Sequence, residues 1–218
     1  MKRLGALFDL DGVLVDTESL YTRFWSDTDR LYPTGIDDYA RAIKGMTLTK
    51  ILENYATDEL KAIIVEAIHN FEATMVYPLM EGAAELLADL RRHGIPTAIV
   101  TSSDSVKMSH LFRDLPDLRP MVDEVIDASK VTRSKPDPQG YLLGAEAIGV
   151  EPENCFVFED SFQGLAAGKA SGAMVVALAT TFPRERIERE AEAHLIIDSL
   201  AGFGVEQMLR LAESISRL

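Results

Sequence analysis

A cluster of carboxylates follows the first apolar segment of the sequence. In the stretch ALFDLDGVLVDTE, residues 6–18, the carboxylates are Asp9, Asp11 and Asp16, and Gly12 follows the second of them. Side chains alternate along a strand, so Asp9 and Asp11 point to the same side and repel each other. A divalent cation relieves this repulsion, and Mg²⁺ prefers oxygen ligands. A carboxylate beside such a metal can attack phosphorus and form an aspartyl-phosphate.

A calcium site and chance both account less well for this cluster. A calcium-binding EF-hand loop has a carboxylate at its fifth position and glutamate at its twelfth, where this sequence has Val13 and Leu20. Chance alone produces D-x-D-G-x-x-x-D in roughly three chains per thousand of this length. We therefore prefer a metal-assisted nucleophile, and we expect Asp16 to hold the next turn by hydrogen bonding to backbone amides. If carboxylate repulsion dominates, Asp11→Asn stabilises the metal-free chain.

Further groups suited to phosphate or metal chemistry stand at the ends of later apolar segments. Thr101 and Ser102 offer hydroxyl and amide donors to phosphate oxygens, Lys135 precedes a helix start, and Glu159 and Asp160 form an acidic pair. Each has a structural alternative, because hydroxyl and acidic residues cap helices and most lysines lie on the surface. Together with the first cluster, however, they form a specific constellation in chain order.

The elements that must position these groups alternate between strands and helices. Apolar runs bounded by polar or turn residues predict buried strands at 4–8, 96–100, 122–126, 155–158, 174–177 and 195–197. Such alternation predicts an α/β fold with a Rossmann-like parallel sheet as its core. The stretch from Thr17 to Leu79 breaks the alternation and has helical patterns throughout. We expect a catalytic core of residues 1–16 and 80–218, and an inserted all-helical cap domain of residues 17–79 over the ligand crevice.

The composition narrows the class of protein. The 218 residues are 47% hydrophobic, which is typical of a globular protein, and the net charge of −13 argues against nucleic acid as a partner. The single cysteine, Cys155, cannot form an internal disulfide. The N-terminal apolar run stops at Asp9, too short for a signal peptide, and no apolar stretch is long enough to span a membrane. We expect a cytoplasmic protein without a membrane partner, monomeric by default.

Four motifs, FDLDGVLVDTE, VTSS, SKPDP and FEDSFQG, resemble in their order those of the haloacid dehalogenase-like (HAD) superfamily. The similarity covers nearly the whole chain and is greatest to the β-phosphoglucomutase-like branch, which has a helical cap. It implies that Asp9 is the nucleophile and an Mg²⁺ ligand. It also implies that Asp11 ligates Mg²⁺ through its backbone carbonyl, while its side chain protonates the leaving alcohol and then activates water. The carboxylate at Asp11 favours phosphate-ester chemistry over the dehalogenase and phosphonatase branches.

The same resemblance assigns roles to the later motifs. Thr101 and the backbone amide of Ser102 bind the transferring phosphoryl group, and Lys135 offsets negative charge on nucleophile and phosphate. Asp160 ligates Mg²⁺, and Glu159 supports the metal directly or through water. A non-enzymatic regulator on the same fold would have lost such residues, and none is missing.

Two positions differ from the mutases of this branch. Tyr21 stands where mutases usually have a hinge histidine, and Leu48 where they have a phosphate-anchoring arginine. We therefore predict a Mg²⁺-dependent phosphatase acting on a small phosphomonoester such as a sugar phosphate, with a hexose-phosphate mutase as the alternative. The residues expected to face the leaving group are Tyr21, Trp25, Lys44, Met46, Thr47 and Leu48. For Trp25, Met46 and Leu48, packing within the cap core is an equal alternative.

Overall fold

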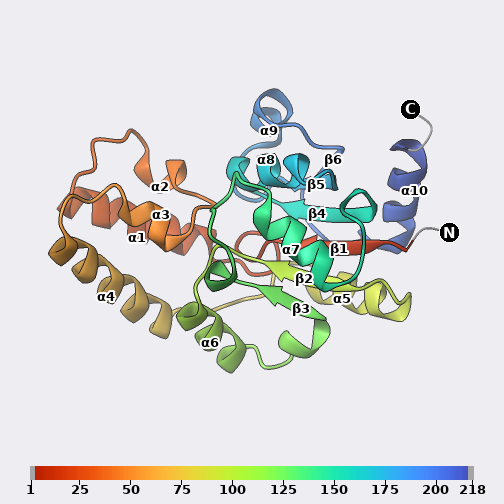
Figure 1. Cartoon of the computed structure of the whole chain (residues 1–218), viewed down its shortest axis with the longest axis horizontal. Helices are drawn as coiled ribbons and strands as arrows, with labels where there is room; N and C mark the ends of the chain where they lie inside the picture. The colour runs from red at the N-terminus through yellow and green to blue at the C-terminus, as the bar shows by residue number, and fades with distance from the viewer. Residues whose placement is uncertain (1–2, 216–218) are drawn as a thin grey trace.

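Six parallel strands form one sheet in this computed structural model, which describes residues 3–215 (Figure 1). Their order across the sheet is β3-β2-β1-β4-β5-β6, and every neighbouring pair is parallel. The strands are β1 (Gly5–Phe8), β2 (Thr97–Val100), β3 (Glu124–Ile126), β4 (Cys155–Glu159), β5 (Met174–Leu178) and β6 (Leu195–Ile197). Each predicted strand is present, with ends that differ by at most two residues. The α/β, Rossmann-like prediction is confirmed.

Both faces of the sheet are covered by helices, so its central strands are buried at every position. Within β1, Ala6 and Phe8 pack into one apolar cluster and Leu7 into the other, as a period of two requires. The first face packs against α5, α6 and α10, and the second against α7, α8 and α9. These helices are α5 (Ala83–Arg92), α6 (Ser105–Asp114), α7 (Gln139–Ala147), α8 (Phe162–Ala170), α9 (Arg184–Glu190) and α10 (Val205–Ile215).

Four more helices lie between β1 and α5 in the chain, and we call residues 17–79 the helical insert. They are α1 (Glu18–Leu31), α2 (Tyr39–Ala42), α3 (Leu48–Leu52) and α4 (Asp58–Thr74). Trp25, Tyr39 and Ile64 belong to an apolar cluster of their own. Figure 1 shows these helices beyond the carboxyl ends of β2 and β3. Apart from one bridge between Val15 and Leu79, the described insert contains no β structure.

The loop after β1 is held by backbone groups. The amide of Asp16 donates to the carbonyl of Pro78 at 2.8 Å, and the amide of Met80 donates to the carbonyl of Leu14 at 2.9 Å. The Asp16 side chain is exposed and accepts no hydrogen bond from the described residues. The expectation that its carboxylate holds this turn is therefore wrong, because the side chain faces solvent instead of the backbone amides.

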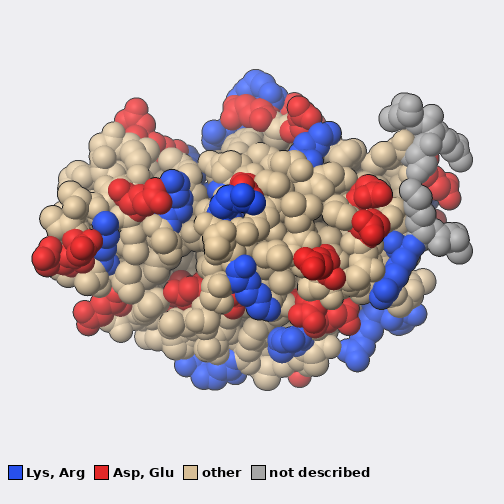
Figure 2. Space-filling model, in the orientation of Figure 1, with Lys and Arg blue, Asp and Glu red and all other residues tan. Residues whose placement is uncertain are grey.

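Charged side chains of both signs are interspersed over the face drawn in Figure 2. Many pair with a neighbour one helical turn away, as in Arg30 with Asp27 and Arg210 with Glu206. Such exposed pairs contribute little to stability. None of the helices in residues 3–215 has the length and apolar character needed to cross a membrane.

Candidate active site

Three carboxylates and a lysine meet at the carboxyl ends of β1 and β4. Asp9 directly follows β1, while Glu159 ends β4 and Asp160 follows it. Because β1 and β4 are adjacent, ligand atoms of all three buried carboxylates lie within 4.8 Å of one another. The Lys135 ammonium group donates to Asp9 Oδ1 at 2.5 Å and to Glu159 Oε1 at 2.6 Å. Sheet topology thus brings together residues that are up to 151 positions apart (160 − 9).

Burial and mutual repulsion disturb the titration of these groups. Burial raises the pKa of Asp9 to about 7; the Lys135 charge opposes this shift and the Glu159 carboxylate adds to it. Burial, with the carboxylates of Glu159 and Asp9, raises the pKa of Asp160 well above its usual value. Burial alone lowers the pKa of Lys135, but Asp9 and Glu159 outweigh burial and raise it. One cation among three buried carboxylates leaves negative charge that a divalent cation would offset.

Glu159 is saturated with hydrogen-bond donors. Besides its contact with Lys135, Oε1 accepts from the Tyr141 hydroxyl at 2.9 Å. Oε2 accepts from the amides of Asp160 and Ser161, both at 2.9 Å, and from the Ser161 hydroxyl at 3.0 Å. The side chain is fully buried and does not line the pocket described below. Its geometry suits it to orient neighbouring groups.

The first turn of α8 approaches Glu159 so closely that it requires glycine. A Cβ atom on Gly164 would lie 1.7 Å from Glu159 Oε1. The Gly164 amide donates to the Ser161 hydroxyl at 3.0 Å, which caps α8. The end of β4, the Ser161 cap of α8 and the close approach of Gly164 together position the acidic pair, Glu159 and Asp160.

The Asp11 carboxylate is held by residues from three other segments. Oδ1 accepts from the Thr17 hydroxyl, while Oδ2 accepts from the Ser103 hydroxyl at 3.2 Å and pairs with the Lys107 ammonium group. Lys107 is only 2% exposed. The sequence motifs did not indicate Thr17 or Lys107. One signal was available, because Lys107 is four residues before the buried Leu111 and so lies on the inward face of α6.

Thr101 and Ser102 follow β2 and line the same pocket as Asp9 and Asp11. The Thr101 hydroxyl accepts from the Ser103 amide at 3.1 Å. The Ser102 hydroxyl donates to the Gly45 carbonyl at 2.6 Å, which links the core to the helical insert. A second link joins the Thr47 amide to the Ser134 hydroxyl at 2.9 Å. The hydroxyl of Thr47 caps α3 and does not line the pocket.

A pocket of about 100 Å³ lies between the helical insert and the core. Trp25, Met46 and Leu48 form part of its apolar wall and also pack into or against the apolar cluster of the insert. For these side chains, packing and pocket lining are therefore not exclusive. Lys44 also lines the pocket and forms an ion pair with Glu18. Burial lowers the pKa of Lys44, against the charges of Asp160 and Asp11.

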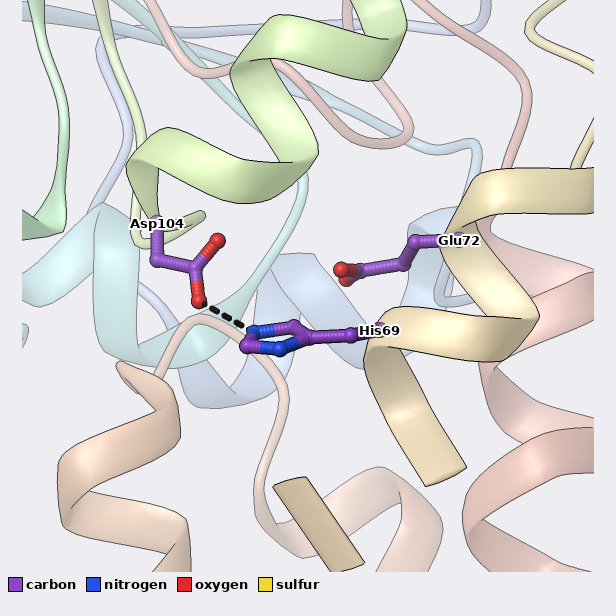
Figure 3. A group of neighbouring side chains, drawn as sticks. All are labelled: His69, Glu72 and Asp104. Atoms are coloured by element: carbon purple, nitrogen blue, oxygen red, sulfur yellow. Dashed lines mark hydrogen bonds and ion pairs between the residues drawn. The ribbon is translucent and has the colours of Figure 1, made fainter. Parts of the chain in front are cut away.

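Three further side chains meet where α4 of the insert faces the start of α6, as Figure 3 shows. The His69 Nε2 atom lies 2.9 Å from Asp104 Oδ2, and the third member is Glu72. Asp104 Oδ1 accepts from the amides of Val106 and Lys107, both at 3.0 Å, and so caps α6. His69 and Asp104 are 35 positions apart in the sequence, so no local motif indicates that they meet.

Fold and site together define a Rossmann-like enzyme whose carboxylates stand at the carboxyl edge of a parallel sheet, beside a helical insert. The chain belongs to the haloacid dehalogenase-like hydrolases, because the model of that family matches residues 5–172. The sequence-based family prediction is confirmed.

Its characterised relatives include phosphatases. The chain is 33% identical to hexitol phosphatase A of Escherichia coli (strain K12) over 207 residues, which cover 92% of this chain and 93% of the relative. It is 32% identical to validoxylamine A 7'-phosphate phosphatase of Streptomyces hygroscopicus subsp. limoneus over 205 residues, covering 89% and 93%. The chain is thus similar to phosphatases over almost its entire length. Its enzyme class is that of the phosphoric monoester hydrolases.

Solved structures agree on the fold. A β-phosphoglucomutase from Clostridium difficile superimposes with a TM-score of 0.83 at 21% identity, over 99% of this chain and 100% of that one. CbbY from Rhodobacter sphaeroides, solved in complex with phosphate, gives a TM-score of 0.76 at 26% identity, over 93% and 97%. At 21% identity the mutase establishes the architecture alone.

Proposed function

We propose that this protein is a Mg²⁺-dependent phosphatase that hydrolyses a small sugar or polyol monophosphate through an aspartyl-phosphate on Asp9. One observation carries the proposal. Buried Asp9 and Asp160 face a pocket beside Lys135, with more negative charge than the lysine balances. The similarity to a hexitol phosphatase and to a phosphatase of a sugar-like phosphate supports the substrate class.

The donor set fits Mg²⁺. Three oxygens accept no hydrogen bond from the described residues: Asp9 Oδ2, Asp160 Oδ1 and the backbone carbonyl of Asp11. Hard oxygen donors of this kind are what Mg²⁺ takes, together with phosphate oxygens. We assign these three as ligands, and we give Glu159 an indirect role because its oxygens are occupied. When bound, Mg²⁺ supplies charge neutralisation and polarises the phosphoryl oxygens.

The residues divide the chemistry between them. Asp9 attacks phosphorus, and Lys135 holds it in place while balancing the charge that develops on the phosphoryl oxygens. The Thr101 hydroxyl and the Ser102 amide donate to the same oxygens. Asp11 gives a proton to the leaving alcohol, and then takes one from the water that hydrolyses the aspartyl-phosphate. Thr17, Ser103 and Lys107 aim its carboxylate.

The helical insert acts, in this proposal, as a cap domain of residues 17–79 that closes on a core of residues 1–16 and 80–218. Polar contacts between the two include Ser102 with Gly45, Ser134 with Thr47, and Asp104 with His69. Lys44, Met46 and Trp25 then surround the leaving group, and Thr47 acts by positioning its loop. A cytoplasmic location and a monomeric state stay predictions from the sequence.

The test is phosphate release from a panel of sugar and polyol monophosphates, with Mg²⁺ and with EDTA. Wild type should release phosphate only with Mg²⁺, and Asp9→Asn should release none above background. Asp16→Asn is the matched control, because it removes an exposed carboxylate from the same loop. Equal phosphate release by wild type and Asp9→Asn contradicts the proposal.

A further inference from the structure

The helical insert contributes a buried carboxylate to the wall of the pocket. Glu72, on α4 of the helical insert, is 6% exposed and lines the pocket. The Tyr21 hydroxyl donates to its Oε1 at 2.8 Å, and the Tyr77 hydroxyl donates to its backbone carbonyl at 2.9 Å. No described residue donates a hydrogen bond to the second oxygen, Oε2. The side chain is thus held in place with one acceptor free.

Two side chains connect Glu72 to Asp11, the proton donor to the leaving oxygen in the proposed function. The Tyr21 ring, whose hydroxyl binds Glu72, has the Lys107 ammonium group 4.4 Å from its centroid. That ammonium group pairs with Asp11. Burial raises the pKa of Glu72, while the charge of Lys107 opposes the shift. Glu72 and Asp11 thus line the same pocket and are linked through Tyr21 and Lys107.

The charges around the pocket do not suit a second anion. Its acidic lining residues are Asp9, Asp11, Glu18, Glu72, Asp104 and Asp160, against two basic residues, Lys44 and Lys107. Both lysines are committed, Lys44 to Glu18 and Lys107 to Asp11. In the proposed function, Mg²⁺ and Lys135 balance the charge of the transferring phosphoryl group and so are not available to a second phosphate. A second phosphate on the substrate finds no free cation among the described lining residues, and it meets the Glu72 carboxylate.

A metal ion is a weaker occupant for this place. Glu72 shares a cluster with His69 and Asp104, whose ligand atoms lie within 4.8 Å of one another (Figure 3). However, the positive charge of Lys107 already favours the ionised form of Glu72 by lowering its pKa, against the effect of burial. Both oxygens of Asp104 are engaged as well, Oδ2 with His69 and Oδ1 with the amides at the start of α6. A neutral hydroxyl can use the free oxygen of Glu72 without displacing any of these contacts.

We propose that Glu72 determines specificity for the leaving group: it accepts a hydrogen bond from a hydroxyl of a neutral sugar or polyol and repels a second phosphate. The enzyme therefore selects monophosphates over bisphosphates. This inference rests on the proposed phosphatase function. A site built to bind a hydroxyl discriminates strongly, because a charged acceptor without a partner is costly, and like charges in one pocket repel.

The experiment compares wild type, Glu72→Gln and Glu66→Gln, which removes an exposed carboxylate from the same helix. The substrates are a hexitol monophosphate, the corresponding bisphosphate and p-nitrophenyl phosphate, whose leaving group carries no aliphatic hydroxyl. The quantity measured is kcat/KM for each, with Mg²⁺. Wild type should prefer the monophosphate over the bisphosphate by about tenfold or more. This ratio should fall by about tenfold in Glu72→Gln and stay unchanged in Glu66→Gln.

The substrate pattern separates a specificity role from a structural one. In Glu72→Gln, kcat/KM should fall more for the hexitol monophosphate than for p-nitrophenyl phosphate. Equal losses on all substrates, or an unchanged ratio, overturn the inference. If Glu72→Gln does not fold, the wild-type measurement still tests the inference. Equal kcat/KM of the wild type for monophosphate and bisphosphate overturns the proposed selectivity. Absence of any Mg²⁺-dependent hydrolysis rejects the phosphatase function itself, a result distinct from hydrolysis without selectivity.

Discussion

Replacing Asp11 by asparagine tests how the metal-free site balances its charges. The spacing of Asp9 and Asp11 in the sequence predicts that this change relieves repulsion and stabilises the chain. The structure predicts the opposite, because the Asp11 carboxylate pairs with Lys107 and accepts from two hydroxyls. Among the causes that raise the pKa of Asp9, the Asp11 charge is smaller than burial or the Glu159 charge, and Lys135 opposes all three. Little repulsion is left for the substitution to relieve.

The magnitude follows from the burial of the pair. The Lys107 side chain is 2% exposed and the Asp11 side chain 15%. Removing one partner of a buried ion pair costs about 3–5 kcal/mol, because the other charge stays buried without compensation. Asparagine keeps one acceptor oxygen for the same donors. We therefore expect the free energy of unfolding to fall by about 2–3 kcal/mol.

The assay is urea unfolding in EDTA near neutral pH. Asp16→Asn serves as control, because its carboxylate is exposed and without a described partner, so it should stay within about 0.5 kcal/mol of wild type. An Asp11→Asn variant as stable as wild type, or more stable, would refute the ion-pair argument and restore the repulsion expected from the sequence.

Three further predictions concern the buried carboxylates. The folded state raises the pKa of Asp9 from 3.8 to about 7, so ionisation above pH 7 costs the metal-free fold roughly 4 kcal/mol. Thermal melts in EDTA should therefore show stability falling as the pH rises from 4 to 8, and a flat profile contradicts this. Lys135→Met should lower kcat by about 100-fold or more, measured by phosphate release, whereas the exposed Lys169→Met should not. Gly164→Ala should lower the free energy of unfolding by about 1–3 kcal/mol in urea, because its Cβ collides with Glu159; unchanged stability contradicts that close approach.

Much of the fold could be predicted from local patterns. Continuous apolar runs such as that of β5 are buried on both faces, so their composition alone distinguishes them from surface segments. The helical insert was also recognisable, because its apolar residues recur at helical spacing and its helices bury their own cluster. Asp16 shows the limit of this reasoning. A carboxylate in a turn suits backbone amides by type, but only the direction of its side chain decides whether it reaches them.

The sequence by itself determined the strands, the inserted helices and the four motifs that end at one sheet edge. It could do so because periodicity and side-chain chemistry are local properties. The tertiary structure alone decided the distant partners: Lys107 for Asp11, Lys135 and Tyr141 for Glu159, and the Glu72 carboxylate in the wall of the pocket. These contacts join segments far apart in the chain, and their distances depend on how helices pack across the sheet. No local sequence pattern encodes that packing, so the balance of charges in the site can be worked out only from the folded structure.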